Sequence, residues 1–235
     1  MGILDTRDLD TMISSMDNLI IPVLNAGIIP YSIAFDIQTA LAEEIRLRDL
    51  KGIVILLEHP PVITIGNNHS KKNLLTSKKR LNRMGIELVN SNRGGDITFH
   101  GPGQIVCYPV FNLNHFGKDL SLFVYNLEQL VINTLHFFGI EGRRIEEHRG
   151  IFVRNLKIAS IGLRVKKWIS IHGFSLNVGI DLSYFEHIVA CGLKDFTQAS
   201  ISSLLGRNIA IDDVKEQIIK SFETVYDISI DKVYL

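Results

Sequence analysis

The stretch RGGDITFHGPGQIVCYPV, residues 93–110, decides the fold, because it joins a glycine-rich segment to a wholly apolar one. The apolar half, residues 105–110, predicts a buried strand. In the first half, Gly94 and Gly95 can adopt positive φ and let the backbone approach a ligand closely. Backbone N–H groups of such a turn can face a carbonyl or phosphate group, with the Arg93 guanidinium beside them. The stretch therefore predicts a binding loop that leads into the core.

A second turn follows within the same stretch. Gly101-Pro102-Gly103 predicts a tight turn that leaves His100 at the edge of a loop, just before the strand. The sequence contains neither GxGxxG nor GxxxxGK[ST], so it supports neither a dinucleotide-binding fold nor a P-loop. A glycine-rich turn that binds nothing is the simpler alternative on spacing alone.

The composition is that of an ordinary globular protein. The 235 residues are 46% hydrophobic and 21% charged, and we expect a single catalytic domain over residues 1–235. Lys and Arg number 25, as do Asp and Glu, so net charge favours neither nucleic acid nor a membrane as a partner. No apolar run reaches the roughly 18 residues of a membrane span. Two cysteines are few for a disulfide scaffold, so we expect reduced thiols and a cytoplasmic location.

Apolar periodicity predicts alternating helices and strands around this stretch. Helices are predicted at residues 32–50, 121–138 and 213–226, the last with Asp213 and Glu216 in capping-box register. Strands are predicted at residues 53–57, 62–65 and 105–110, and in runs that begin at Gly150, Lys157 and Trp168. Residues 1–30 are poorly defined. The irregular alternation predicts a mixed α/β (α+β) fold in which helices flank a mixed sheet.

Five motifs together resemble one enzyme family. The sequence is similar to the octanoyltransferases of lipoate biosynthesis, the lipoyl(octanoyl) transferases or lipoate-protein ligase B family, in RGGDITFHGPGQIVCY, HPPVITIG from His59, KIASIGLRV from Lys157, HGFSLNV from His172 and ACG from Ala190. The similarity extends over residues 31–204. It implies a fold shared with lipoate-protein ligases and the catalytic domain of biotin-protein ligases.

The resemblance also implies an activity. These enzymes transfer an octanoyl group from octanoyl-acyl carrier protein to a lysine of lipoyl domains, in 2-oxoacid dehydrogenases and in the glycine cleavage H protein. The donor is already a thioester, and the product is an amide, so neither ATP nor another cofactor is implied.

The two cysteines differ in their surroundings. Cys107 lies within IVCYPV, where a buried small hydrophobe is expected. Cys191 lies where apolar chain gives way to Gly192 and polar residues, and is the better candidate nucleophile. Lys157 begins an apolar strand, where desolvation would ease proton loss, although a solvated surface lysine is the alternative. In the resembled family the matching cysteine is the nucleophile, and the matching lysine pairs with it.

The resemblance further implies a pocket for the acyl chain and the thioester. Its residues are Arg93, Gly94, Gly95, Asp96, Ile97, Thr98, Phe99, His100, Ser160, Ile161, Gly162, Gly173, Phe174 and Ser175. The glycines would admit a thin chain, and Ile161 and Phe174 would contact an alkyl tail. Neither His100 nor His172 belongs to a CxxC or HExxH arrangement, so no metal site is expected, and neutral hydrogen-bonded histidines are the better interpretation.

Three features depart from the family pattern or lie beside it. Ala190 stands where the family usually has proline, which loosens the backbone just before Cys191. Arg149 stands where proline is common and is interpreted as loop variation. Residues 71–83, KKNLLTSKKRLNR, contain six basic residues and no acidic one. Such a run is usually a solvated loop, but it could instead dock an acidic carrier protein or lipoyl domain.

Two alternatives to a transferase are kept open. An ATP-dependent lipoate ligase shares the implied fold, but such ligases carry a longer glycine run in the corresponding loop and need no nucleophilic cysteine. A catalytically silent module that only binds acyl carriers or lipoyl domains is the other alternative, and Ala190 keeps it open.

Overall fold

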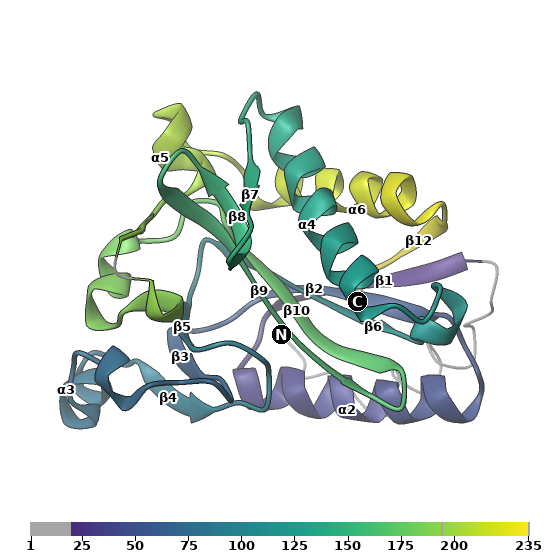
Figure 1. Ribbon diagram of the computed structural model, residues 1–235, viewed down its shortest axis with the longest axis horizontal. Coiled ribbons are helices and arrows are strands. Elements are labelled where there is room, and N and C mark those ends of the chain that lie inside the picture. The colour runs from purple at the N-terminus through teal and green to yellow at the C-terminus, as the bar shows by residue number, and fades with distance from the viewer. Residues whose placement is uncertain (1–19, 194, 235) are drawn as a thin grey trace.

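A mixed β-sheet forms the centre of the molecule (Figure 1). The structure is a computed structural model that describes residues 20–193 and 195–234. Within them nine strands form this sheet, eight in the order β12-β1-β2-β6-β10-β9-β8-β7 and β11 paired with β9. Parallel pairing joins β1 to both of its neighbours and β11 to β9, whereas the other pairs are antiparallel. The strands are β1 (Ile20–Ile28), β2 (Gly52–Glu58), β6 (Gln104–Phe111), β7 (Arg143–Ile145), β8 (His148–Val153), β9 (Leu156–Lys166), β10 (Ile169–Asn177), β11 (Thr197–Gln198) and β12 (Ser229–Tyr234).

Helices cover both faces of this sheet, which confirms the predicted fold class. Figure 1 shows α2 on one face and α4 and α6 together on the other. Leu41 of α2 and Val106 of β6 belong to one buried cluster, whereas Leu127 of α4, Phe174 of β10 and Phe222 of α6 belong to the opposite one. Burial of apolar surface contributes about 25 cal/mol per Å², so these two clusters stabilise the layers. The helices are α2 (Tyr31–Leu47), α3 (Lys78–Arg83), α4 (Leu120–Phe137), α5 (Ile201–Leu205) and α6 (Ile211–Tyr226).

A smaller sheet stands beside the large one. Its three strands, in the order β4-β3-β5, are β3 (Val62–Ile65), β4 (Glu87–Asn90) and β5 (Ile97–His100). The proline pair at positions 60 and 61 ends β2, and the chain leaves the large sheet for the small one, since proline cannot continue the ladder. The sequence predicted no strand at residues 97–100, and this was wrong: β5 pairs antiparallel with β3 along its length. His100 therefore ends a buried strand.

The main predicted helices are confirmed, but one cap is wrong. α2 and α4 lie where the apolar periodicity placed them, and Gly139, with φ 73°, follows the end of α4. α6 begins at Ile211, and its N-cap Ala210 makes no side-chain hydrogen bond, so the expected capping box of Asp213 and Glu216 does not form. Asp213 instead lies in the first turn, where a negative charge stabilises the helix dipole.

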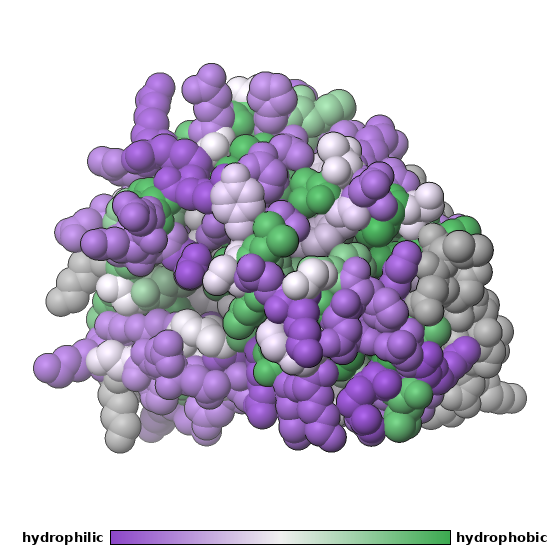
Figure 2. All heavy atoms as spheres, turned by 45° about the vertical axis from the view of Figure 1, so that its right-hand side comes forward, coloured by the Kyte–Doolittle hydropathy of each residue, from purple (hydrophilic) through white to green (hydrophobic). Residues whose placement is uncertain are grey.

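The remaining segments are short. Four 3₁₀ turns join the main elements within the described residues: η1 (Lys71–Asn73), η2 (Leu113–His115), η3 (Leu182–His187) and η4 (Ala190–Gly192). The poorly defined N-terminal segment contains β1, and its residues 1–19 lie outside the described residues. In the part of the chain that the structure describes, no helix is long and apolar enough to cross a bilayer. The face drawn in Figure 2 is mostly hydrophilic, with apolar side chains in scattered groups.

Candidate active site

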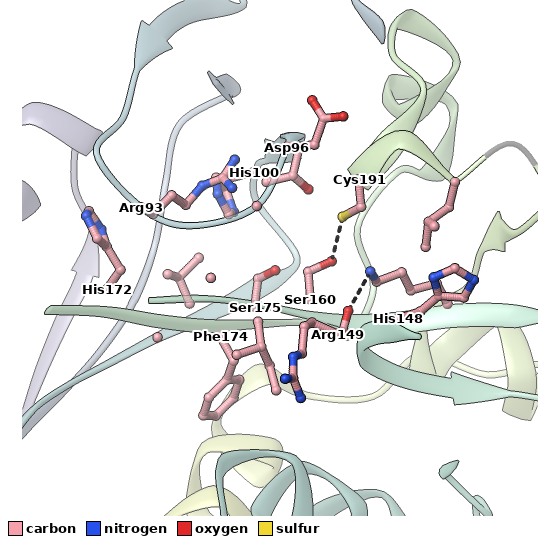
Figure 3. Close-up of a pocket in the computed structure, with 18 of the residues that line it drawn as sticks. Arg93, Asp96, His100, His148, Arg149, Ser160, His172, Phe174, Ser175 and Cys191 are labelled. Atoms are coloured by element: carbon pink, nitrogen blue, oxygen red, sulfur yellow. Dashed lines mark hydrogen bonds between the residues drawn. The ribbon is translucent and has the colours of Figure 1, made fainter. Parts of the chain in front are cut away.

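A cavity of about 200 Å³ lies where the small sheet, β9 and β10 approach the turn that carries Cys191 (Figure 3). Cys191 and Ser160 lie toward one side of it and His172 toward the other. Most of the predicted site residues line this cavity. They are Arg93, Gly95, Asp96, Thr98, His100, Lys157, Ser160, Ile161, Gly162, Gly173, Phe174, Ser175 and Cys191.

The paired strands β9 and β10 supply a narrow passage. In their register Ser160 lies opposite Ser175, and Gly162 lies opposite Gly173. A Cβ atom at Gly162 would come within 3.1 Å of the Gly94 carbonyl oxygen and 3.2 Å of Arg93 Cδ. Glycine at this position therefore leaves room for a thin ligand between β9 and the loop of Arg93.

Cys191 lies in a strained turn. Its φ of 56° and ψ of 18° are left-handed, a conformation that few non-glycine residues adopt. The side chain is half-buried, and Sγ lies 3.6 Å from the Ser160 hydroxyl (Figure 3). The thiol is thus held at the wall of the cavity, in a region that solvent still reaches.

Cys107 is fully buried, and burial raises the pKa of its thiol well above the usual range, which confirms it as a core residue.

Lys157 is a buried lysine at the same cavity. Only 1% of the residue is exposed, and Nζ donates a hydrogen bond of 2.9 Å to the Arg149 carbonyl oxygen. Nζ also lies 5.4 Å from the centre of the Phe152 ring. Among the described residues no carboxylate is within ion-pair distance of it, and no hydrogen bond joins it to Cys191. A buried lysine without a counter-ion is rare in proteins. Where one occurs, it is often part of a functional site.

Arg93 is the second buried cation. Its guanidinium donates to the Thr64 hydroxyl and carbonyl and to the Gly94 carbonyl oxygen. Burial lowers the pKa of Arg93, and the neighbouring Cys191 and Tyr31 act in the opposite direction. Arginine stays charged even so, because its pKa starts above about 12. The guanidinium therefore places a fixed positive charge near Cys191.

A directional hydrogen-bond chain links Arg93 to the core. The Gln104 amide donates to Phe99 O and Asn177 Oδ1, so its Oε1 accepts from His100 Nδ1 at 2.6 Å. His100 Nε2 then accepts from the Thr64 hydroxyl at 3.3 Å, and that hydroxyl itself accepts from Arg93. The chain fixes both the tautomer of His100 and the orientation of Arg93.

The other buried histidines are also neutral. His59 donates to the Ile29 carbonyl oxygen and accepts from the Tyr108 hydroxyl, and His172 donates to Asn92 Oδ1. Burial lowers the pKa of His59 to about 4 and that of His172 to about 3. It also lowers the pKa of His100 well below the usual value. No group of three or more potential metal ligands occurs among the described residues.

The protein should lose stability in mild acid because of these histidines. Their folded pKa values lie below the unfolded value of about 6.5, so the unfolded state binds protons first as the pH falls. The free energy of unfolding should decrease between pH 6.5 and about 4, by up to about 1.4 kcal/mol per pH unit for each histidine. Urea unfolding at several pH values measures this slope. The exposed His136 supplies the control, since His136→Gln should keep the slope, and a flat profile in the wild type would contradict the assignment.

Three predicted residues do not line the cavity. The sequence predicted that backbone N–H groups of this turn face a ligand. The N–H of Gly94 instead donates to the Leu163 carbonyl oxygen, so it is not free to bind one. Ile97 and Phe99 point into a separate core cluster, where Phe99 stacks on Tyr184 at 4.7 Å. The reason is that residues 97–100 form a strand, in which successive side chains point to opposite faces.

Phe174 also differs from the expectation. Its ring belongs to the core cluster under α4, and Figure 3 shows it on the opposite side of β10 from Ser175. Its contact with an alkyl tail stays a prediction.

Residues that the sequence did not single out also line the cavity, among them Tyr31, Tyr108 and His148. Tyr31 comes from the first turn of α2, which no motif connects to the loop of Arg93.

His172 reaches the cavity through a break in the regular strand. Its φ is 61°, and this left-handed residue disrupts the alternation of β10. The ring stacks on Phe35 and Tyr31 of α2, with ring centroids 5.8 and 6.5 Å apart. It therefore lies on the same face of the sheet as Ile171. Its Nε2 bond to Asn92 agrees with the expected neutral, hydrogen-bonded histidine, whose role stays a prediction.

Comparison with known proteins first defines the class. A model of the lipoyl protein ligase A/B catalytic domain matches residues 30–223. An octanoyltransferase from Caldicellulosiruptor saccharolyticus is 44% identical over 200 residues, which cover 84% of this chain and 85% of the relative. The chain therefore belongs to the octanoyltransferase family and is an acyltransferase.

The fold agrees with more distant structures. A bipartite lipoate protein ligase from Thermoplasma acidophilum matches with a TM-score of 0.71 at 16% identity, over 92% of this chain and 88% of the other. The biotin protein ligase from Aquifex aeolicus matches with a TM-score of 0.53 at 11% identity, over 88% of this chain and 70% of the other. The fold that the sequence motifs implied is thus confirmed.

Proposed function

We propose that this chain transfers an octanoyl group from octanoyl-acyl carrier protein to lysine side chains of lipoyl domains, through a thioester on Cys191. One observation carries the proposal. Cys191 and the buried, counter-ion-free Lys157 line the same narrow cavity, beside the fixed charge of Arg93. A thiol, a buried amine and a cation are the groups that a two-step acyl transfer requires.

In the first step, Cys191 Sγ attacks the thioester carbonyl of the carrier. The carbon–sulfur bond to the carrier thiol breaks, the octanoyl group moves to Sγ, and the proton from Cys191 ends on the departing carrier thiol. In this proposal Lys157 relays the proton once Nζ leaves the Arg149 carbonyl oxygen, which its flexible four-carbon side chain allows. The positive charge of Arg93 favours the developing oxyanion.

In the second step, the amine of a lipoyl-domain lysine attacks the octanoyl thioester. The bond between the carbonyl carbon and Sγ breaks, an amide forms, and Lys157 passes the proton of the attacking nitrogen to Sγ, which restores the free thiol. Exchange of one thioester for another is nearly balanced, and conversion of a thioester to an amide is favourable, so the sequence of steps needs no ATP.

The acceptors are proposed by analogy. The ligase from Thermoplasma acidophilum is described together with its E2 lipoyl domain. We take lipoyl domains of 2-oxoacid dehydrogenases and the glycine cleavage H protein as acceptors here.

Transfer from octanoyl-carrier protein to an apo lipoyl domain, without ATP, tests the proposal. Modification that requires free octanoate and ATP would identify a ligase, and binding without transfer would identify a silent module.

We propose that the basic segment, residues 71–83, docks the carrier. It borders the turn of Cys191, because Leu74 pairs with Ile188 and the Asn73 carbonyl oxygen accepts from Val189 N at 2.7 Å. Of its basic residues, those whose side chains the structure describes are all exposed: Lys72, Lys78, Lys79, Arg80 and Arg83. An acidic carrier bound there would have its thioester close to Cys191.

Charge reversal tests this surface. The triple variant Lys78→Glu, Lys79→Glu and Arg80→Glu should raise KM for octanoyl-carrier protein by about tenfold and weaken its dependence on salt. Initial rates at several salt concentrations measure both effects.

A matched control reverses three exposed lysines elsewhere, Lys118, Lys166 and Lys167. They lie at or near the β9–β10 hairpin, at the opposite end of the molecule from α3 (Figure 1). An equal rise in KM for both triple variants, or for neither, would remove the docking assignment.

A further inference from the structure

The turn of Cys191 needs support from outside itself. A non-glycine residue in the left-handed region costs about 1–3 kcal/mol and persists only where its surroundings hold it. Within the turn, Gly192 N donates to the Val189 carbonyl oxygen and Leu193 N to the Ala190 carbonyl oxygen. These two bonds close the turn, but they do not fix its position relative to the cavity.

The support comes from the start of the basic segment. Residues 73–75 run antiparallel to residues 187–189, the three residues that lie two to four positions before Cys191. Val189 N donates to the Asn73 carbonyl oxygen at 2.7 Å, and Leu75 N donates to the His187 carbonyl oxygen at 2.9 Å. The backbone that leads into the nucleophile is therefore held by the backbone of Asn73.

The Asn73 side chain makes a second link. Its Nδ2 donates to Asp96 Oδ2, and the other oxygen of Asp96 accepts from Ile97 N at 2.7 Å and Ser70 N at 3.3 Å. A Cβ atom at Gly192 would lie 2.9 Å from Asp96 Oδ2 and 3.3 Å from Asn73 Nδ2, so the pair packs directly on the turn. Figure 3 shows Asp96 beside the segment that carries Cys191.

We propose that Asn73 is a positioning residue for Cys191. Its main chain holds the approach to the nucleophile, and its amide ties that approach to Asp96 in the loop that begins at Arg93. The thiol and the cation are thereby held on opposite walls of one cavity. This inference rests on the proposed function, because it requires Cys191 to be the residue that is acylated.

Exchange of donor and acceptor tests the link. Asn73→Asp places two carboxylates in contact, and their repulsion should displace the turn. The double variant Asn73→Asp, Asp96→Asn restores one hydrogen bond in the reverse direction, because the amide at position 96 donates to the carboxylate at position 73. The oxygen of that amide still accepts from Ile97 N and Ser70 N. Asp96→Asn alone should have a mild effect, since the Asn73 amide can rotate to accept.

The measurement is the rate of Cys191 acylation by octanoyl-carrier protein, followed by intact mass over a range of carrier concentrations. Asn82→Asp is the matched control, because it adds the same charge to the basic segment at an exposed position. Asn73→Asp should lower the maximal rate by about tenfold or more. Its half-saturating concentration should match that of Asn82→Asp, and the double variant should recover most of the rate.

Two results would overturn the role of Asn73. One is a maximal rate for Asn73→Asp equal to that of Asn82→Asp. The other is a double variant that is acylated as slowly as Asn73→Asp although the two are equally stable towards urea. The hydrogen bond would then be restored without the rate, so its loss would not be the cause of the slow acylation. No acylation of Cys191 in the wild type is a different outcome, because it would overturn the proposed function first.

Discussion

Replacement of Lys157 by methionine is expected to lower octanoyl transfer by about 10²- to 10⁴-fold, the range for loss of a positioned acid–base group. Methionine has a similar length and fills the buried site without a charge. The Arg149 carbonyl oxygen loses its donor, but the cost of burying a polar Nζ without a counter-ion is also removed. The protein should therefore remain folded. Initial rates with octanoyl-carrier protein and apo lipoyl domain, together with urea unfolding, separate activity from stability.

Lys166 supplies the control for this variant. It lies in the same strand, β9, but is exposed and remote from the cavity of Cys191. Lys166→Met should transfer octanoyl at the wild-type rate. If Lys157→Met transferred as fast as Lys166→Met at normal stability, Lys157 would have no part in the chemistry.

The substitution Gly173→Ala is expected to lower the free energy of unfolding by about 3 kcal/mol or more. The added Cβ would lie 2.1 Å from the Cys107 carbonyl oxygen and 2.6 Å from Pro109 Cδ. Neither is the end of a flexible side chain, so β10 and β6 must separate at the centre of the sheet. Urea unfolding measures the loss directly.

Gly179→Ala is the matched control. Gly179 follows the same strand, and a Cβ there would meet only the Ser202 hydroxyl, at 3.5 Å. Its stability should change by less than about 0.5 kcal/mol. If the two variants were equally stable, β6 and β10 would not be packed as closely at Gly173 as the structure has them.

Local patterns predicted most of the large sheet and its helices. Apolar periodicity located α2 and α4, and β-rich runs located β2, β6, β8, β9 and β10 of the large sheet and β3 of the small one. The prolines at positions 60 and 61 indicated a break between two strands, but not that the second strand joins another sheet. Such a partner choice depends on contacts distant in sequence, which no local pattern contains.

The candidate site was predicted as a set of residues and not as an arrangement. Residues 93–100 were treated as one loop, so the alternation that turns Phe99 into the core and Thr98 into the cavity was missed. A period of two in ITFH was the available signal. Asn73 had no signal of its own, because its importance arises only when residues 73–75 pair with residues 187–189.

The central claim is that Cys191 carries the octanoyl group. Intact mass spectrometry after incubation with octanoyl-carrier protein, without ATP and without an acceptor, tests it most directly. The wild type and Cys107→Ala should each gain the mass of one octanoyl group, and hydroxylamine should remove it as it cleaves a thioester, whereas Cys191→Ala should gain nothing. An unmodified wild type, or a modified Cys191→Ala, would contradict the account.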